Sequence, residues 1–190
     1  MPRIPVHTLE TVPEASREHA ERLTTKMGRF MNIHAGMAHS PVVIATYQGM
    51  QKALADNGTF DARTREAIAL AVGNQNGCDY CQGAHTVSAR RAGFDDVQIL
   101  ALRAGEVDFD DRLAALTEVT RAAAADTGNV PDPLWQAALN AGWTDTELAE
   151  AFAHIAVNLF TNYFNHYAHT ELDVPPAEPL TARLHQTHST

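Results

Sequence analysis

Helix-capping residues and glycines recur along this chain, and almost no segment alternates between apolar and polar residues as a β-strand would. Ser40-Pro41 pairs a capping residue with a proline at the first helical position, and Thr144 with Glu147 forms a capping box. These helix-capping and helix-terminating residues predict an all-α fold of seven or eight helices without a sheet. The expected helical segments are 13–30, 41–56, 61–77, 78–92, 95–105, 110–125, 132–142 and 144–170.

The two ends of the chain are rich in proline and lack helical spacing. Residues 1–12 are expected to form an N-terminal arm, and residues 174–190 a C-terminal tail. Between them no linker or low-complexity segment divides the chain, so we expect a single domain over residues 1–190.

The charge balance excludes several classes of protein. Fourteen basic and twenty-three acidic side chains give a net charge of −9, which argues against a nucleic-acid or anionic-membrane partner. No apolar run spans a bilayer, no secretory signal opens the chain, and two cysteines are too few for a disulfide scaffold. We therefore expect a soluble, cytoplasmic protein.

Both cysteines lie in one short motif at the expected start of a helix. Cys78, Cys81 and His85 occupy positions i, i+3 and i+7, which share one helix face. Unpaired N–H groups in the first turn favour a thiolate, and a histidine one turn later can take the proton. If the chain folds back at Gly77, Glu66 on the preceding helix can face His85 and orient it.

The roles of the two thiols follow from two opposing effects. The helix terminus favours Cys78 as the more acidic thiol, whereas proximity to His85 favours Cys81. We assign the reactive thiol to Cys81, because a base in contact should outweigh the helix terminus. Two other interpretations remain open: small buried cysteines, or half of a zinc site with His85 and a fourth ligand from His166 or His169.

The pattern Glu66-x11-Cys78-x2-Cys81-x3-His85 resembles the core motif of the AhpD-like alkylhydroperoxidases, within the carboxymuconolactone decarboxylase superfamily. A looser resemblance covers residues 28–175. It implies an AhpD-like all-α fold, peroxidase activity at the dithiol, and homo-oligomers such as trimers or hexamers. Carried over, Cys81 is the peroxidatic thiol and Cys78 the resolving one, while His85 is the base and Glu66 relays protons to it.

The implied reaction is thiol-dependent reduction of an organic hydroperoxide. Cys81 attacks the peroxide and becomes a sulfenic acid, Cys78 condenses with it to a redox-active disulfide, and an external dithiol restores both thiols. That reductant would be dihydrolipoamide-like or thioredoxin-like, and no metal or haem cofactor is required. Tyr80, expected beside the dithiol, replaces a histidine of AhpD itself.

Two other functions stay open at this stage. The first is a carboxymuconolactone decarboxylase-like lyase or isomerase, although such relatives do not need the dithiol. The second is a redox-sensing or zinc-binding protein without turnover. Peroxide turnover with a dithiol distinguishes the peroxidase from a redox-sensing or zinc-binding protein.

The spacing of the motif recurs near the C-terminus as Glu150, Asn162, Asn165 and His169. Sliding residues 66–86 onto residues 150–170 gives seven identities in twenty-one positions. This faint repeat is the basis for a hypothesis of two pseudo-symmetric halves, with redox chemistry in the first only. It requires residues 150–170 to form a second helix-turn-helix unit.

Overall fold

The computed structural model describes residues 1–180, and every regular element in this range is a helix, as the sequence predicts. A short 3-10 helix, η1, precedes nine α-helices. The bounds are η1 (Glu14–Ser16), α1 (Arg17–Met27), α2 (Asn32–Met37), α3 (Pro41–Asn57), α4 (Ala62–Gln75), α5 (Asp79–Arg91), α6 (Asp96–Ala104), α7 (Asp111–Ala125), α8 (Asp132–Asn140) and α9 (Asp145–Ala168).

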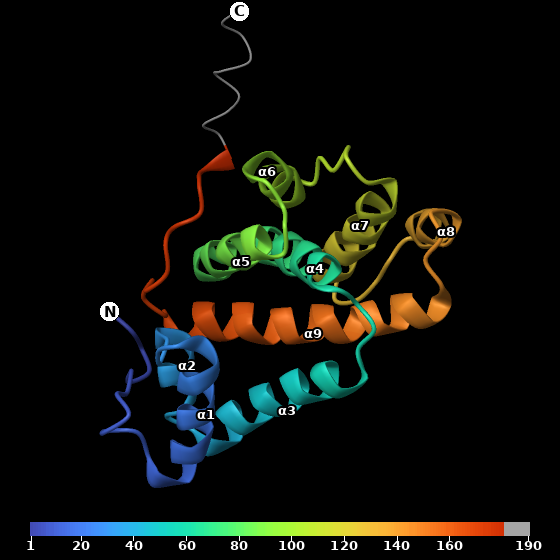
Figure 1. Cartoon of the computed structure of the whole chain (residues 1–190). Coiled ribbons are helices and arrows are strands. Elements are labelled where there is room, and N and C mark those ends of the chain that lie inside the picture. The colour runs from blue at the N-terminus through green and yellow to red at the C-terminus, as the bar shows by residue number, and fades with distance from the viewer. Residues whose placement is uncertain (181–190) are drawn as a thin grey trace, which may run out of the picture.

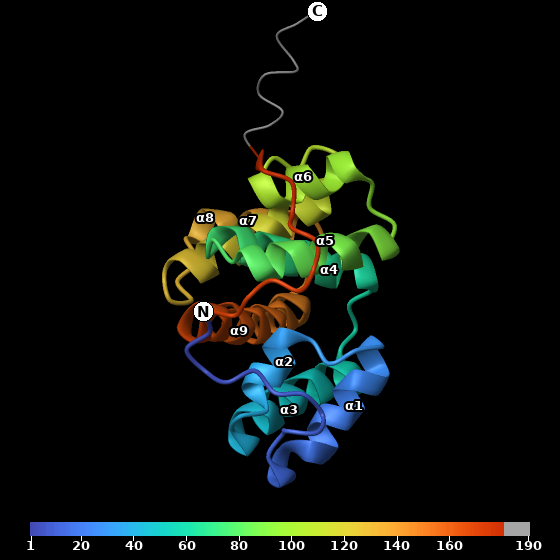
Figure 2. The ribbon, with the colours of Figure 1, turned by 90° about the vertical axis from the view of Figure 1, so that its left-hand side faces the viewer.

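The long helix α9 crosses the middle of the molecule, and the other helices lie on its two sides (Figures 1 and 2). On one side α4 packs against α5, α6, α7 and α9. On the other side lie α1, α2 and α3. The buried apolar side chains form two clusters: one centred on α4, α6, α7 and α9, and a second built from the N-terminal helices. Both cysteines belong to the second cluster, at the boundary between the two sides.

Side-chain caps begin several helices where the sequence predicts them. An aspartate precedes α4, α6 and α7, and its carboxylate accepts a hydrogen bond from a backbone N–H in the first turn. Thr144 and Glu147 form the predicted capping box at the start of α9. These caps define the starts of α4 and α9, two of the helices that contact the dithiol segment, through the Gly73 carbonyl and Asn165. The three capping aspartates are Asp61, Asp95 and Asp110.

The N-terminal region differs from the prediction. Residues 13–30 form η1 and then α1, which ends at Gly28 with a φ of 77°. The six-residue helix α2 was not predicted, because Met31 at its start makes no side-chain cap. Its residues Ile33 to Met37 are all buried, so tertiary packing holds this helix in place of a local signal.

The hypothesis of a repeated helix-turn-helix unit is wrong. The chain turns between α4 and α5 at Gly77, whose φ is 61°. The corresponding C-terminal segment is instead part of one continuous helix, α9, which runs without a break from Asp145 to Ala168. Alanine-rich helices share identities by chance, and here the shared residues do not share a fold.

The two ends of the described chain lie against the helices without forming regular structure. Residues 1–13 contain no helix, and the Arg3 N–H donates to the Ala168 carbonyl at 2.8 Å. Residues 174–180 of the expected tail follow α9 and pass over α5 at Gly83, and Arg103 on α6 donates to the Glu178 carbonyl at 2.6 Å. The remainder of that tail, residues 181–190, lies outside the described residues. Within residues 1–180 no helix combines the length and apolar character needed to cross a membrane.

Candidate active site

Cys78 and Cys81 form a buried dithiol at the start of α5. Cys78 is the N-cap residue, and its Sγ accepts a hydrogen bond from the Cys81 N–H at 3.3 Å. The two Sγ atoms lie 2.7 Å apart, both thiols are free, and the residues are 1% and 3% exposed. The helix N-terminus thus places the sulfur atoms within reach of each other, which a disulfide requires.

The two thiols differ in acidity. The hydrogen bond from the Cys81 thiol lowers the pKa of Cys78 to about 7 against the effect of burial, and the Cys81 N–H and Asn165 contribute further. The hydrogen bond with Cys78, together with burial, raises the pKa of Cys81. Cys78 is therefore the more acidic thiol, so the expectation that His85 outweighs the helix terminus and favours Cys81 does not hold for acidity. No hydrogen bond within the described chain joins His85 to either sulfur.

Asn165 connects α9 to the dithiol. Its amide Nδ2 lies 3.3 Å from Cys81 Sγ and 3.8 Å from Cys78 Sγ, and it donates to both. We expect Asn165→Ala to raise the pKa of Cys78, because the thiolate loses a hydrogen-bond donor. The check is the pH dependence of alkylation by iodoacetamide: the midpoint should move upward and alkylation at pH 7 should slow. An unchanged midpoint would mean that Asn165 has only a packing role.

Glu66 and His85 lie together, as the spacing predicts. Glu66 Oε2 is 2.7 Å from His85 Nδ1, and both side chains are half-buried. Burial lowers the pKa of His85, but the charge and hydrogen bond of Glu66, with the charge of Cys78, outweigh it and leave the pKa raised. His85 therefore holds a proton more firmly than an ordinary histidine does.

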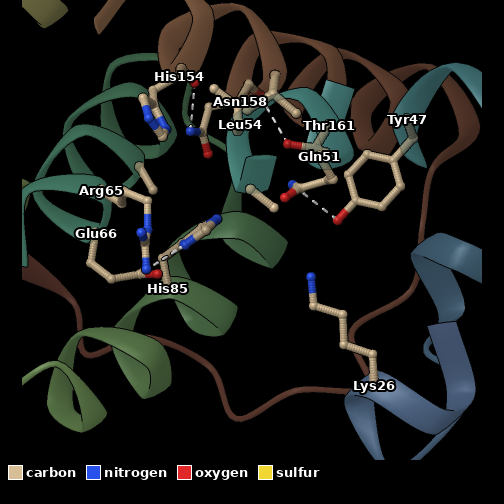
Figure 3. A pocket seen from close by; sticks show the side chains of 13 residues that line it. Lys26, Tyr47, Gln51, Leu54, Arg65, Glu66, His85, His154, Asn158 and Thr161 are labelled. Atoms are coloured by element: carbon tan, nitrogen blue, oxygen red, sulfur yellow. Dashed lines mark hydrogen bonds and ion pairs between the residues drawn. The ribbon is translucent and has the colours of Figure 1, made fainter. Parts of the chain in front are cut away.

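The Glu66–His85 pair forms one wall of a cavity of about 410 Å³ (Figure 3). Lys26 enters from α1, Tyr47 and Gln51 from α3, and the opposite wall comes from α9. The lining is rich in polar and ionisable groups, which suits a polar small molecule. The lining residues are Lys26, Tyr47, Gln51, Leu54, Ala55, Arg65, Glu66, Ala69, His85, His154, Val157, Asn158 and Thr161.

A smaller cavity of about 120 Å³ reaches Cys81. Tyr47, His85 and Thr161 line both cavities, so the two spaces are adjacent and meet at these residues. His34 on α2 also lines the small cavity; the residue is 4% exposed, and its Nδ1 has no hydrogen-bond partner among the described residues. Burial lowers the pKa of His34 to about 4, so this imidazole is neutral at pH 7.

The N-terminal residues of these cavities were missed by the sequence analysis. His34, Tyr47 and Lys26 stand more than thirty positions before Cys78, outside the motif. Their contribution depends on how α1, α2 and α3 pack against α9. The one local signal is the lone histidine in an apolar segment, which is more often a buried core residue.

The other predicted polar residues occupy supporting positions. Tyr80 donates its hydroxyl proton to Asp173 at 2.6 Å, beyond the end of α9. His166 Nε2 donates to the Asn76 carbonyl at 3.0 Å, and His169 ends α9 with a φ of 53°. Among residues 1–180 no three His, Cys, Asp or Glu side chains gather as metal ligands. The described residues therefore offer no set of ligands for the zinc site considered from the sequence.

Comparison with known proteins connects this site to a family. Residues 41–125 match the sequence model of the carboxymuconolactone decarboxylase family. The fold matches a crystal structure of an uncharacterised peroxidase-related protein with an alkylhydroperoxidase AhpD core, from Ralstonia eutropha JMP134. Its TM-score is 0.79 and its identity 21%, over 94% of each chain. The chain therefore has the AhpD-like fold, and its residues 41–125 are similar to the carboxymuconolactone decarboxylase family.

Other similar proteins match over a shorter segment or at lower identity. An uncharacterised Cupriavidus necator protein is 39% identical over 51 residues, and the match covers 27% of this chain and 45% of that relative. The chain thus matches less than half the length of this curated relative. The debrominase Bmp8 has a TM-score of 0.76 at 15% identity, over 90% of this chain and 92% of its own. A cysteine-to-alanine variant of Bmp8, solved with 2,3,4-tribromopyrrole, has a TM-score of 0.74.

Proposed function

We propose that this protein is a thiol-dependent reductase of organic hydroperoxides, with Cys78 and Cys81 as its redox pair. The observation that carries the proposal is the dithiol itself: two sulfur atoms 2.7 Å apart, one with a pKa of about 7, beside a cavity that holds the Glu66–His85 pair. A low thiol pKa gives a large thiolate fraction at neutral pH, which a nucleophilic or redox-active cysteine needs.

Cys81 is the thiol that attacks the peroxide, because its side chain lines the small cavity, which is adjacent to the larger one. In the reactive state Cys78 is a thiolate that accepts the Cys81 S–H, and Glu66 raises the pKa of His85, which favours the protonated imidazole. As the Cys81 sulfur attacks, its proton moves to Cys78. The imidazolium of His85, held by Glu66, is placed to protonate the departing alkoxide.

The first step forms one S–O bond and breaks the peroxide O–O bond. It yields the alcohol and a sulfenic acid on Cys81, with Cys78 as a thiol and His85 neutral. In the second step Cys78 loses its proton to His85 and attacks the Cys81 sulfur. The S–S bond forms while hydroxide leaves, and that proton completes a water molecule. One hydroperoxide thus oxidises one dithiol to a disulfide, an alcohol and water.

The disulfide needs an external two-electron donor for the next turnover. We assign this role to a dithiol of the dihydrolipoamide or thioredoxin kind, which a reducing compartment such as the cytoplasm supplies. We also propose that the chain works as a homo-oligomer, a trimer or hexamer. The aromatic side chains of Phe152, Tyr163 and Tyr167 on α9 are more than half exposed and offer an apolar surface for such contacts.

The test is intact mass spectrometry on reduced, metal-free protein, before and after one equivalent of cumene hydroperoxide. The expected result is the loss of two hydrogens with one equivalent of alcohol formed, reversed by dihydrolipoamide. The double variant Cys78→Ser/Cys81→Ser is the matched control and should stay unmodified. Thiols that remain reduced after exposure to the hydroperoxide would contradict the proposal.

The same protein samples distinguish the peroxidase from the alternative reaction class. A decarboxylase or isomerase of the carboxymuconolactone type does not need the dithiol. Its turnover of a carboxylated lactone should therefore survive in the double cysteine variant. Lactone turnover by that variant, together with inert thiols in the wild type, would select this alternative.

A further inference from the structure

The chain contains two lysines, and they have different surroundings. Lys52 on α3 pairs with Asp56 one turn later, at 2.5 Å on the surface. Lys26 in the last turn of α1 lines the large cavity, and its side chain extends toward the Tyr47 hydroxyl (Figure 3). The ion pairs of residues 1–180 do not include Lys26.

The cavity is cationic although the chain carries a net charge of −9. Arg65 is the second cation in its lining; it donates to the Phe60 carbonyl at 2.8 Å and forms no ion pair with a described carboxylate. Glu66, the acidic residue of the lining, is bound to His85. The lining therefore has an excess of positive charge that no described side chain neutralises.

Tyr47 stands between the cations and the dithiol. Its ring lines both the large cavity and the small one at Cys81, and its hydroxyl accepts a hydrogen bond from Gln51 at 3.4 Å. No described acceptor takes the proton of that hydroxyl, so it can donate to a ligand. A ligand that passes Tyr47 can thus have one end at Cys81 and the other beside Lys26.

We propose that the substrate of this site is an organic hydroperoxide that also carries a carboxylate, with the carboxylate bound at Lys26 and the peroxide group at Cys81. This inference rests on the proposed function for its reacting group and on the lining charges for its acidic group. A carboxylate beside an ammonium group in a partly enclosed cavity forms a charge-assisted hydrogen bond. The combined spaces of about 410 Å³ and 120 Å³ suit a small aromatic or aliphatic acid rather than a macromolecule.

The experiment compares cumene hydroperoxide with its para-carboxylate, which has the same reacting group and differs by one charge. We expect the wild-type kcat/KM to be about tenfold higher for the carboxylate at low ionic strength, the size of one charge-assisted hydrogen bond. Added salt should reduce this ratio, because it screens the ion pair. A wild-type ratio near one would overturn the proposal.

Three variants locate the effect. Lys26→Met removes the charge but keeps the length of the side chain, and should lose most of the ratio, whereas Lys26→Arg should retain it. Lys52→Met is the matched control: it removes the chain's other lysine charge, and the ratio should stay unchanged. A ratio that survives in Lys26→Met, or that falls equally in Lys52→Met, would overturn the assignment to Lys26.

A binding measurement keeps this inference separate from the peroxidase proposal. The two alcohols that correspond to the two hydroperoxides can be titrated into reduced wild-type protein and Lys26→Met by calorimetry. Tighter binding of the carboxylated alcohol to the wild type alone would support the anion site even if neither hydroperoxide is consumed. Equal binding of both alcohols to the wild type would overturn it even if both hydroperoxides are consumed.

Discussion

Replacing Cys81 by serine is expected to abolish hydroperoxide consumption. Cys81 is the cysteine that lines the small cavity beside the larger one, and serine in its place offers a far weaker nucleophile. The measurement is stopped-flow or coupled consumption of cumene hydroperoxide by prereduced protein. Loss of the signal to the background rate is the expected result.

Replacing Cys78 by serine should have a different effect. The Cys81 thiol remains and can be oxidised, but no neighbouring thiol can condense with it. We expect one oxidation per chain, slower than in the wild type because the acidic partner at 2.7 Å is lost, ending at a sulfenic acid. Dimedone labelling followed by peptide mass spectrometry should place this product on Cys81.

Two other outcomes would contradict these roles of Cys81 and Cys78. If Cys81→Ser consumes one equivalent of peroxide and dimedone labels Cys78, the roles of the two thiols are reversed. The low pKa of Cys78, rather than access to the cavity, would then determine which sulfur attacks the peroxide. If both single variants turn over as fast as the wild type, the dithiol has no part in the reaction.

His85→Ala should slow the first oxidation by about 10²- to 10⁴-fold, the usual effect of removing a proton-transfer group. The alkoxide then leaves without the proton that His85 provides. Single-turnover rates of sulfenic acid or disulfide formation measure this directly. A rate equal to the wild type would give His85 a structural role only. Asp61→Ala, which removes the side-chain cap at the start of α4, serves as the control for a general loss of stability.

Glu66→Gln tests how His85 keeps its proton. Glutamine preserves the hydrogen bond at 2.7 Å but removes the charge that raises the pKa of His85. Activity should rise as Cys78 loses its proton near pH 7, and fall at higher pH as His85 loses its own. In Glu66→Gln the alkaline fall should move to lower pH while the rise stays in place. A profile without this shift would contradict the proton-donor role.

The helices were largely predictable from local chemistry. The caps at Asp61, Asp95 and Thr144 act through bonds between residues three positions apart, so the sequence contains both partners. The dithiol motif and the Glu66–His85 pair were predictable for a similar reason, since a single turn at Gly77 relates α4 to α5. By contrast, α2 has no side-chain cap and is held by burial, which a local pattern does not contain.

The remainder of the site depends on long-range packing. Lys26, His34 and Tyr47 reach the cavities because α1, α2 and α3 pack beside α9 and the start of α5. The faint repeat fails for the same reason: its spacing predicts a second turn within residues 150–170, whereas long-range packing accommodates one continuous helix there. Asn165 does meet the cysteines, but as a donor from a different helix.

The position of Cys78 as the cap of α5 affects both the acidity of its thiol and the reduction potential of the Cys78–Cys81 pair. The fold favours the Cys78 thiolate, since its pKa lies near 7 rather than at the ordinary value of 9.0. Whatever favours the thiolate favours the reduced state of the pair over the disulfide, and so raises its reduction potential. The disulfide of such a pair is therefore a good electron acceptor. Cellular dithiols of low potential would return it to the reduced state with a favourable free energy, so the resting protein would carry two thiols.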